Sequence, residues 1–284
     1  MIAAIHGIGY QRLTAATEQP KWRKALAASL AIAEVEPAYA DTLQFLAYGD
    51  LFLPRGFRAG ADPPFDATDV DQDFEVELLR RWYREAQRTD PNLPKLGEPT
   101  RLIPIPNIVQ KMLDALSLSK TFAGISEHAL IFNLKQVRTY MSDDVIRSAI
   151  QERIAHNMLA GTRLIIAHSL GTVVAYEAIC AHPEWKIEGL ITMGSPLGIH
   201  NLVFDRLIPH PLDGTGQWPE GLKWWTNVAD EGDIVAIEKH LSNRFGSKVE
   251  DWVIDNGIAE VHGAEKYLAQ PAVGASLRHL HLSS

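Results

Sequence analysis

The stretch Leu164–Ile179, which reads LIIAHSLGTVVAYEAI, constrains the fold of this chain more than any other segment. It opens with a continuous apolar run, which is typical of a strand buried on both faces. Small residues around Ser169 then permit a sharp turn, and a helical pattern follows directly. A buried strand that turns at once into a helix favours a sheet whose faces are both covered by helices.

Other apolar segments of strand length alternate with helical patterns along the chain. The predicted strands are residues 1–5, 42–48, 162–167, 190–193, 224–229 and 249–254. The predicted helices are residues 20–34, 74–87, 142–159 and 265–280, with Pro20 at a first helical position and Pro271 dividing the last helix. Strands separated by helices imply parallel pairing through right-handed crossovers. The predicted fold class is therefore α/β, with a mostly parallel sheet of about six strands and helices on both faces.

The composition is that of a globular chain. Hydrophobic residues make up 46% of the 284 residues, which is enough for a large core and excludes disorder for most of the chain. The 27 basic and 35 acidic residues give a net charge of −8 without a block of five like charges, so no nucleic-acid partner is expected. A single cysteine, Cys180, excludes an internal disulfide framework and a Cys-rich zinc site. His200 and His210 lack tight ligand spacing, so neither a metal nor a cofactor is expected.

The sequence contains no stretch that approaches the roughly 18 apolar residues needed to cross a bilayer. Its first residues, MIAAIHGIGY, lack a basic leader. We therefore expect a cytoplasmic protein without a transmembrane segment. Peripheral contact with a membrane stays open, and the sequence does not predict an oligomeric state.

The pentad Ala167–Gly171 places a serine hydroxyl at the turn from strand to helix. A serine in this position is both rigidly held and reachable, which is what a nucleophile requires. Ser169 is therefore the candidate nucleophile, and the alternative is a surface serine that caps the helix. Ser195 is not favoured, because a proline follows it and no pattern for a helix start supports an elbow there.

The same pentad resembles the nucleophile elbow, G-x-S-x-G, of the α/β-hydrolase superfamily in its lipase- and esterase-like branch, with alanine in the first position. The resemblance covers about residues 1–50 and 142–284, and the first two strands of the family plan are missing. Residues 51–141 lie outside it, and eight of the chain's sixteen prolines fall between Pro54 and Pro106. We interpret this segment as a lid- or cap-like insertion within a single domain spanning residues 1–284.

The resemblance implies a triad in the chain order serine, acid, histidine. The segment after the strand at 224–229 resembles the D-x-V-[PA] segment that carries the lipase acid, and Asp233 matches the acid position, with Asp230 as the alternative. His262 follows the strand at 249–254 and opens a loop similar to the family's loop before its last helix. His168 belongs to the elbow itself and is not expected to act as the base.

The resemblance also implies two backbone donors for the oxyanion of the tetrahedral intermediate. One is the N–H of Leu170, directly after the nucleophile. The other comes from the segment His6–Gly9, where the N–H of Ile8 is preferred and that of Gly7 is the alternative.

Together these residues predict a serine hydrolase that cleaves a carboxylic ester of a small-molecule or lipid-like substrate. An acyltransferase or a peptidase with the same triad is one alternative, and a non-catalytic interaction module that kept the fold is another. The apolar residues between Ile108 and Leu118 could face an acyl chain from a lid. A helix packed on the core is the favoured interpretation, because apolar stripes at helical spacing usually belong to the core.

Overall fold

The computed structural model describes residues 1–53, 65–71, 73–95, 105–122, 125–257 and 260–280. Within these residues, six strands form one sheet in which every neighbouring pair is parallel, in the order β2-β1-β3-β4-β5-β6. The strands are β1 (Ile2–Ile5), β2 (Leu43–Leu46), β3 (Leu164–His168), β4 (Gly189–Met193), β5 (Trp224–Asp230) and β6 (Val249–Ile254). The predicted α/β class with a parallel sheet of six strands is confirmed.

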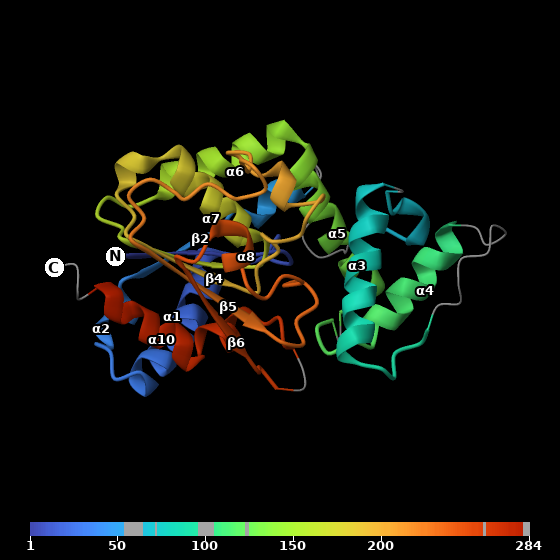
Figure 1. The fold of residues 1–284 in the computed structure, drawn as a ribbon, viewed down its shortest axis with the longest axis horizontal. Coiled ribbons are helices and arrows are strands. Elements are labelled where there is room, and N and C mark those ends of the chain that lie inside the picture. The colour runs from blue at the N-terminus through green and yellow to red at the C-terminus, as the bar shows by residue number, and fades with distance from the viewer. Residues whose placement is uncertain (54–64, 72, 96–104, 123–124, 258–259, 281–284) are drawn as a thin grey trace.

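Helices cover both faces of this sheet (Figure 1). The helices α1 (Ala15–Ile32), α9 (Ala264–Leu268) and α10 (Pro271–Ser276) lie on one face, and α6 (Asp144–Asn157) and α7 (Leu170–Ala181) lie on the other. The remaining helices are α2 (Ala38–Asp41), α3 (Phe74–Thr89), α4 (Ile105–Ser117), α5 (Glu127–Ser142) and α8 (Ser242–Phe245). Five short 3-10 helices span Gly49–Phe52, Ala67–Asp69, Pro183–Trp185, Phe204–Arg206 and Leu277–Leu280.

β1 and β3 read as nearly continuous apolar runs because alternate side chains enter two different cores. In β1, Ala3 and Ile5 pack in the core that contains α7, whereas Ile2 and Ala4 pack in the core that contains α1. The same alternation holds in β3, whose five residues are all buried. Burial on both faces removes the polar positions that a half-exposed strand would show.

Each of the four predicted helices differs from the structure by one or more residues at its boundaries. α1 begins at Ala15 rather than near Pro20, because Thr14 caps it by accepting a hydrogen bond from the Thr17 N–H, and Pro20 lies inside the helix. The last predicted helix is divided at Pro271, as expected, into α9 and α10 with a 3-10 turn after them. The prolyl ring at the start of α10 occupies a position where no intrahelical N–H donor is needed.

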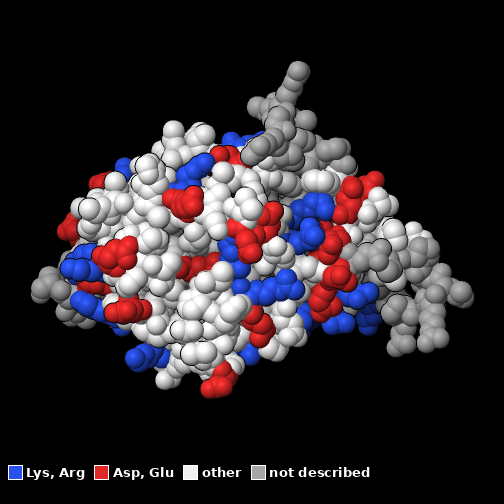
Figure 2. All heavy atoms as spheres, turned by 90° about the horizontal axis from the view of Figure 1, so that it is seen from above, with Lys and Arg blue, Asp and Glu red and all other residues white. Residues whose placement is uncertain are grey.

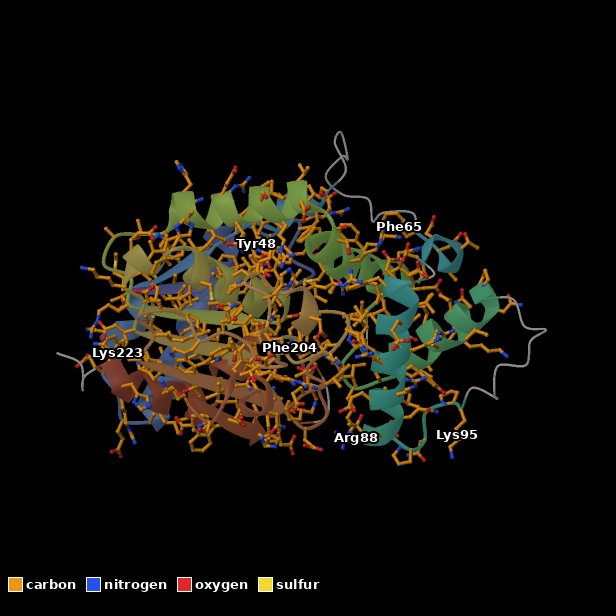
Figure 3. The ribbon with its side chains drawn as sticks, turned by 45° about the horizontal axis from the view of Figure 1, so that its top comes forward. Tyr48, Phe65, Arg88, Lys95, Phe204 and Lys223 are labelled. Atoms are coloured by element: carbon orange, nitrogen blue, oxygen red, sulfur yellow. The ribbon has the colours of Figure 1, made fainter. Side chains whose placement is uncertain are left out.

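The segment 51–141 forms more helix than its sequence predicts. α3 was predicted, and the apolar residues between Ile108 and Leu118 were interpreted as a helix, which is α4. α5 was not predicted, and it continues to Ser142. α3 and α4 lie side by side at one end of the molecule with α5 between them and the sheet layers, and Phe65 and Arg88 belong to this part (Figures 1 and 3). Tyr48 and Phe204, by contrast, lie in the main body (Figure 3).

The apolar stripe of α4 is buried. Val109, Met112, Leu113 and Leu116 are each at most 1% exposed and join the same core as α7, whereas Leu118 is exposed. The interpretation of this stripe as a helix packed on the core is therefore correct. Whether the segment as a whole acts as a lid stays a prediction.

Charged residues of both signs are interspersed on the face seen in Figure 2. Within the described part of the chain, none of the helices combines the length and the apolar character that a membrane span requires.

Candidate active site

The topology gathers the candidate residues at one point of the sheet edge. The chain passes from β1 to β2 and then returns past β1 to β3, so the strand order reverses between β1 and β3. In open α/β sheets, ligands bind outside the carboxyl ends of the strands at such a switch point. β1 leads directly into His6–Gly9 and β3 leads into Ser169, and these two strands are paired neighbours.

Ser169 stands at a strained turn between β3 and α7. Its backbone has φ 53° and ψ −132°, a conformation that non-glycine residues rarely adopt and that costs about 1–3 kcal/mol. Its N–H donates to the Met193 carbonyl oxygen (2.9 Å), while its side chain makes no capping hydrogen bond to α7. Ser169 is 1% exposed. The alternative of a surface serine that caps the helix is therefore wrong.

Asp233 and His262 contact each other directly. His262 Nδ1 donates a hydrogen bond to Asp233 Oδ2 (2.6 Å), and Asp233 Oδ1 accepts a second one from the Val235 N–H (2.9 Å). Burial by itself would raise the pKa of the Asp233 carboxyl, but the charge and hydrogen bond of His262, with help from Lys239, outweigh burial and hold this pKa below its usual value. The carboxylate is therefore ionised and fixes the imidazole with its Nδ1 protonated and its Nε2 free.

Asp230, the alternative acid, does not contact His262. Its Oδ1 accepts a hydrogen bond from the Gly232 N–H (2.7 Å), and its Oδ2 accepts one from the Asn256 N–H. Both carboxylate oxygens of Asp230 therefore accept hydrogen bonds from backbone N–H groups of neighbouring loops. Of the two acids, the structure brings only Asp233 to the imidazole.

The hydroxyl of Ser169 and Nε2 of His262 are both buried, and neither has a hydrogen-bond partner among the described residues. The serine-to-histidine hydrogen bond of a complete triad is thus not formed here. Such hydrogen bonds are often long before substrate binds. The two residues nevertheless share one site, because His168, which precedes Ser169, packs against the His262 ring with centroids 4.6 Å apart.

The loop after β1 touches Ser169. A Cβ added to Gly7 would lie 2.3 Å from Ser169 Cβ, so only glycine allows this approach. The N–H groups of Ile8 and Leu170 donate no hydrogen bond to any described part of the chain. They are the two donors that the sequence singles out for an oxyanion, and both lie beside Ser169.

The turn at Gly194 and Ser195 forms a wall of the site. A Cβ on Gly194 would lie 2.9 Å from Asp233 Oδ2 and 3.0 Å from His262 Nδ1, so this glycine backs directly onto the acid–base pair. Ser195 Oγ is within 2.7 Å of Thr172 Oγ1 and accepts a hydrogen bond from the backbone. Its hydroxyl is occupied in structural bonds, in contrast to that of Ser169.

Two residues that the sequence did not single out hold the acid in place. The Tyr267 hydroxyl accepts a hydrogen bond from the Asp230 N–H (2.8 Å) and donates one to Asp233 Oδ2 (2.7 Å). Lys239, which is buried, donates from Nζ to the Asp233 carbonyl oxygen and lies 3.8 Å from Glu85 of α3. The hydrogen bond from Tyr267 orients the Asp233 carboxylate. Lys239 links the loop that carries Asp233 to the 51–141 segment.

The 51–141 segment meets the acid-bearing loop at two further points. Thr121 Oγ1 donates to the Gly232 carbonyl oxygen (3.2 Å), and Arg88 lies 3.1 Å from Glu231 Oε1. These contacts place α3 and the end of α4 over the carboxyl ends of the strands.

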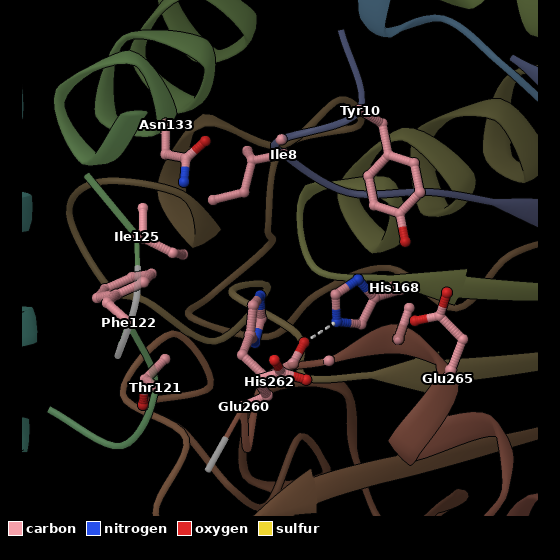
Figure 4. Close-up of a pocket in the computed structure, with 13 residues that line it drawn as sticks. Ile8, Tyr10, Thr121, Phe122, Ile125, Asn133, His168, Glu260, His262 and Glu265 are labelled. Carbon is pink, nitrogen blue, oxygen red and sulfur yellow. Dashed lines mark hydrogen bonds between the residues drawn. The ribbon is translucent and has the colours of Figure 1, made fainter. Parts of the chain in front are cut away.

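A pocket of about 400 Å³ opens beside His262 (Figure 4). The pocket is lined by the loop after β1, residues of the 51–141 segment, the end of β3, the β6–α9 loop and the start of α9. Its lining residues are Ile8, Gly9, Tyr10, Thr121, Phe122, Ile125, Asn133, His168, Glu260, His262, Gly263, Ala264 and Glu265. In the described part of the chain, no three His, Cys, Asp or Glu side chains are grouped so that they could hold a metal ion.

His6 anchors the loop that carries Gly7 and Ile8. The His6 side chain is fully buried, donates from Nδ1 to the Gly7 carbonyl oxygen (2.8 Å) and accepts from the Tyr48 N–H at Nε2 (3.1 Å). Burial is the main cause that lowers the pKa of His6 to about 4, although the hydrogen bond to Gly7 and the Asp50 carboxylate act in the opposite direction. His6 is therefore neutral near pH 7.

We expect the protein to lose stability as the pH falls from about 6.5 towards 4. In this window unfolded His6 takes up a proton and folded His6 does not, so the unfolded state binds more protons and the free energy of unfolding decreases with falling pH. The full contribution is about 3 kcal/mol. Urea denaturation between pH 7.5 and 5 should show about 2 kcal/mol of this loss. A His6→Gln protein should be less stable at pH 7.5 but show a shallower pH dependence, and an equal slope in both proteins would contradict the assignment.

No family model matches the chain, and no curated protein matches it in sequence.

Proposed function

We propose that the protein is a serine hydrolase of the α/β-hydrolase type, lipase- or esterase-like, which cleaves a carboxylic ester through an acyl-enzyme on Ser169. One observation carries the proposal. An imidazole held by a buried carboxylate has its second nitrogen free, and it shares a site with an unbonded serine hydroxyl on a strained strand-to-helix turn. The proposed substrates are small esters or lipid-like esters, and the proposed location is the cytoplasm.

In the proposed mechanism, His262 Nε2 takes the proton of the Ser169 hydroxyl while its oxygen attacks the ester carbonyl carbon. The tetrahedral intermediate collapses when the C–O bond to the alcohol breaks and His262 returns the proton to the leaving oxygen. Water then repeats the sequence on the acyl-enzyme, releasing the acid and restoring the serine. Asp233 stabilises the imidazolium in both halves of the reaction and stays ionised throughout.

The negative oxygen of each tetrahedral intermediate receives hydrogen bonds from the N–H groups of Leu170 and Ile8. Both donors are free of other partners among the described residues, so no bond has to break before they act. A preorganised donor of this kind is worth about 3–4 kcal/mol of transition-state stabilisation. The loop anchored by His6 therefore contributes as much as a catalytic side chain.

A fluorophosphonate probe tests the proposal directly, because it reacts covalently with an activated serine. We expect stoichiometric labelling at Ser169 and none in the Ser169→Ala protein. Absence of labelling between pH 6 and 9 would favour the alternative of a non-catalytic interaction module. Product analysis with added alcohols or amines would separate hydrolysis from acyl transfer, and peptide substrates would test the peptidase alternative.

A further inference from the structure

The pocket beside His262 has two chemically different walls (Figure 4). Phe122 and Ile125 of the 51–141 segment, together with Ile8, form an apolar wall that the polar residues Thr121 and Asn133 flank. His168 and Glu265 lie on the other side of His262 and make that wall polar. The lining contains no lysine or arginine.

His168 lines this pocket and carries a buried ring nitrogen that accepts no hydrogen bond from the described residues. Its Nε2–H donates to the His262 carbonyl oxygen (2.8 Å), which leaves Nδ1 as the lone-pair nitrogen of a neutral ring. Burial, with the nearby His262, lowers the pKa of His168 well below its usual value, so the ring stays neutral. The side chain is 4% exposed and its Nδ1 has no partner in the described residues. A buried acceptor left without a donor is costly, so a ligand that brings a hydrogen-bond donor to this nitrogen would gain binding free energy.

Glu265 adds negative charge to the same wall. Its carboxylate accepts no hydrogen bond from any described residue. Lys21 interacts electrostatically with Glu265, but it forms its ion pair with Glu18 (2.8 Å). Glu260 also lines the pocket, at an exposed position. The polar wall therefore offers acceptors and negative charge without a compensating cation in the lining.

We infer that this pocket selects esters whose alcohol part carries a hydroxyl or ammonium donor, which His168 Nδ1 and Glu265 accept while the apolar wall takes the acyl group. The inference rests on the proposed function. His262 must protonate the leaving oxygen, so the alcohol part lies beside His262, and His168 packs against that ring at 4.6 Å. An anionic alcohol part is disfavoured, because Glu260 and Glu265 give the lining negative charge and no lysine or arginine lines the pocket.

A matched series of butyrate esters separates hydrogen bonding from charge. The five alcohol parts are 2-hydroxyethyl, 2-(dimethylamino)ethyl, choline, 3,3-dimethylbutyl and 2-sulfoethyl. At pH 7 the second is an ammonium with one N–H, choline has the same charge without a donor, and 3,3-dimethylbutyl is the neutral counterpart of choline. Each kcat/KM is divided by the ester's rate of hydroxide-catalysed hydrolysis, which removes differences in intrinsic reactivity.

We expect the 2-hydroxyethyl ester to exceed the 3,3-dimethylbutyl ester about tenfold, and the 2-(dimethylamino)ethyl ester to exceed the choline ester by about the same factor. The 2-sulfoethyl ester should be the poorest of the five. His168→Gln keeps an amide N–H for the His262 carbonyl but loses the acceptor at Nδ1, so it should bring the 2-hydroxyethyl to 3,3-dimethylbutyl ratio towards one. A purely structural role for His168 would lower all five values equally and leave this ratio unchanged.

Glu265→Gln should reduce the ratio of the choline ester to the 2-sulfoethyl ester about tenfold. Glu220→Gln is the matched control, because it removes the same charge from an exposed position. Glu220 precedes β5 and so lies near the amino ends of the strands, whereas the pocket lies at their carboxyl ends. Equal normalised values for all five esters in the parent protein, with Ser169-dependent hydrolysis of p-nitrophenyl butyrate intact, would overturn this inference alone. Absence of both hydrolysis and fluorophosphonate labelling would overturn the proposed function, and the inference with it.

Discussion

The Ser169→Ala protein is expected to hydrolyse p-nitrophenyl butyrate roughly 10⁶-fold more slowly than the parent, because removing the hydroxyl removes the acyl-enzyme pathway. Rate enhancement over water from the oxyanion donors and from binding should remain, at roughly 10³–10⁴-fold. The fold should be preserved, since the Ser169 hydroxyl makes no hydrogen bond among the described residues. Steady-state kinetics measure the loss, and thermal unfolding checks the fold.

Ser195→Ala is the matched control for this substitution. Ser195 is as buried as Ser169, at 1% exposure, but its hydroxyl is hydrogen-bonded to Thr172 and to the Leu197 N–H. We expect a loss of about 1 kcal/mol in stability and less than about a tenfold loss in kcat/KM. If Ser169→Ala kept the parent's rate, or if Ser195→Ala alone abolished it, the assignment of the nucleophile would be wrong.

The sheet could be predicted from sequence because its strands are buried on both faces. In β3 every residue is apolar or lies at the elbow, so the run is distinct in length and character from the helical patterns around it. α3 was predicted for a related reason, since its apolar residues form one clear stripe. α5 was missed because it is buried on more than one side. Its consecutive residues Leu130–Leu134 are all buried between the sheet layers and α3, which leaves no periodic stripe to detect.

Some residues of the candidate site could likewise be predicted from the sequence, and others could not. Ser169 and its turn follow from local chemistry, because small neighbours and an abrupt change from strand to helix are visible in a single segment. Tyr267 could not be assigned in this way, since its contact with Asp233 joins α9 to the β5–β6 connection. Lys239 could not be assigned either, since its contact with Asp233 depends on how that connection folds back on itself. The contact between His168 and His262 spans 94 residues of sequence for the same reason.

Asp233→Asn is expected to lower kcat by about 10⁴-fold while the protein stays folded. The neutral amide has nearly the shape of the carboxylate, but it cannot stabilise the imidazolium that forms when His262 takes the serine proton. If its NH2 group replaced Oδ2, it would face both His262 Nδ1 and the Tyr267 hydroxyl, which now donate to that oxygen, and if it replaced Oδ1 it would face the Val235 N–H. Either arrangement favours the wrong tautomer or leaves a buried donor unpaired. Single-turnover kinetics with p-nitrophenyl butyrate measure the acylation step that should carry the loss.

Asp230→Asn distinguishes the two acids, since it makes the same chemical change three residues earlier. Asp230 accepts hydrogen bonds from the Gly232 and Asn256 N–H groups, and an amide can accept only one of them well. The expected result is a loss of about 1–3 kcal/mol in stability, with a fall in kcat far smaller than that of Asp233→Asn. Because Tyr267 contacts both Asp230 and Asp233, the effects of the two substitutions on stability and activity should not be additive in the double variant. If a folded Asp230→Asn protein were as inactive as Asp233→Asn, the 2.6 Å hydrogen bond between Asp233 and His262 would not be sufficient for activity. Asp230 would then act on His262 through Tyr267 and Asp233.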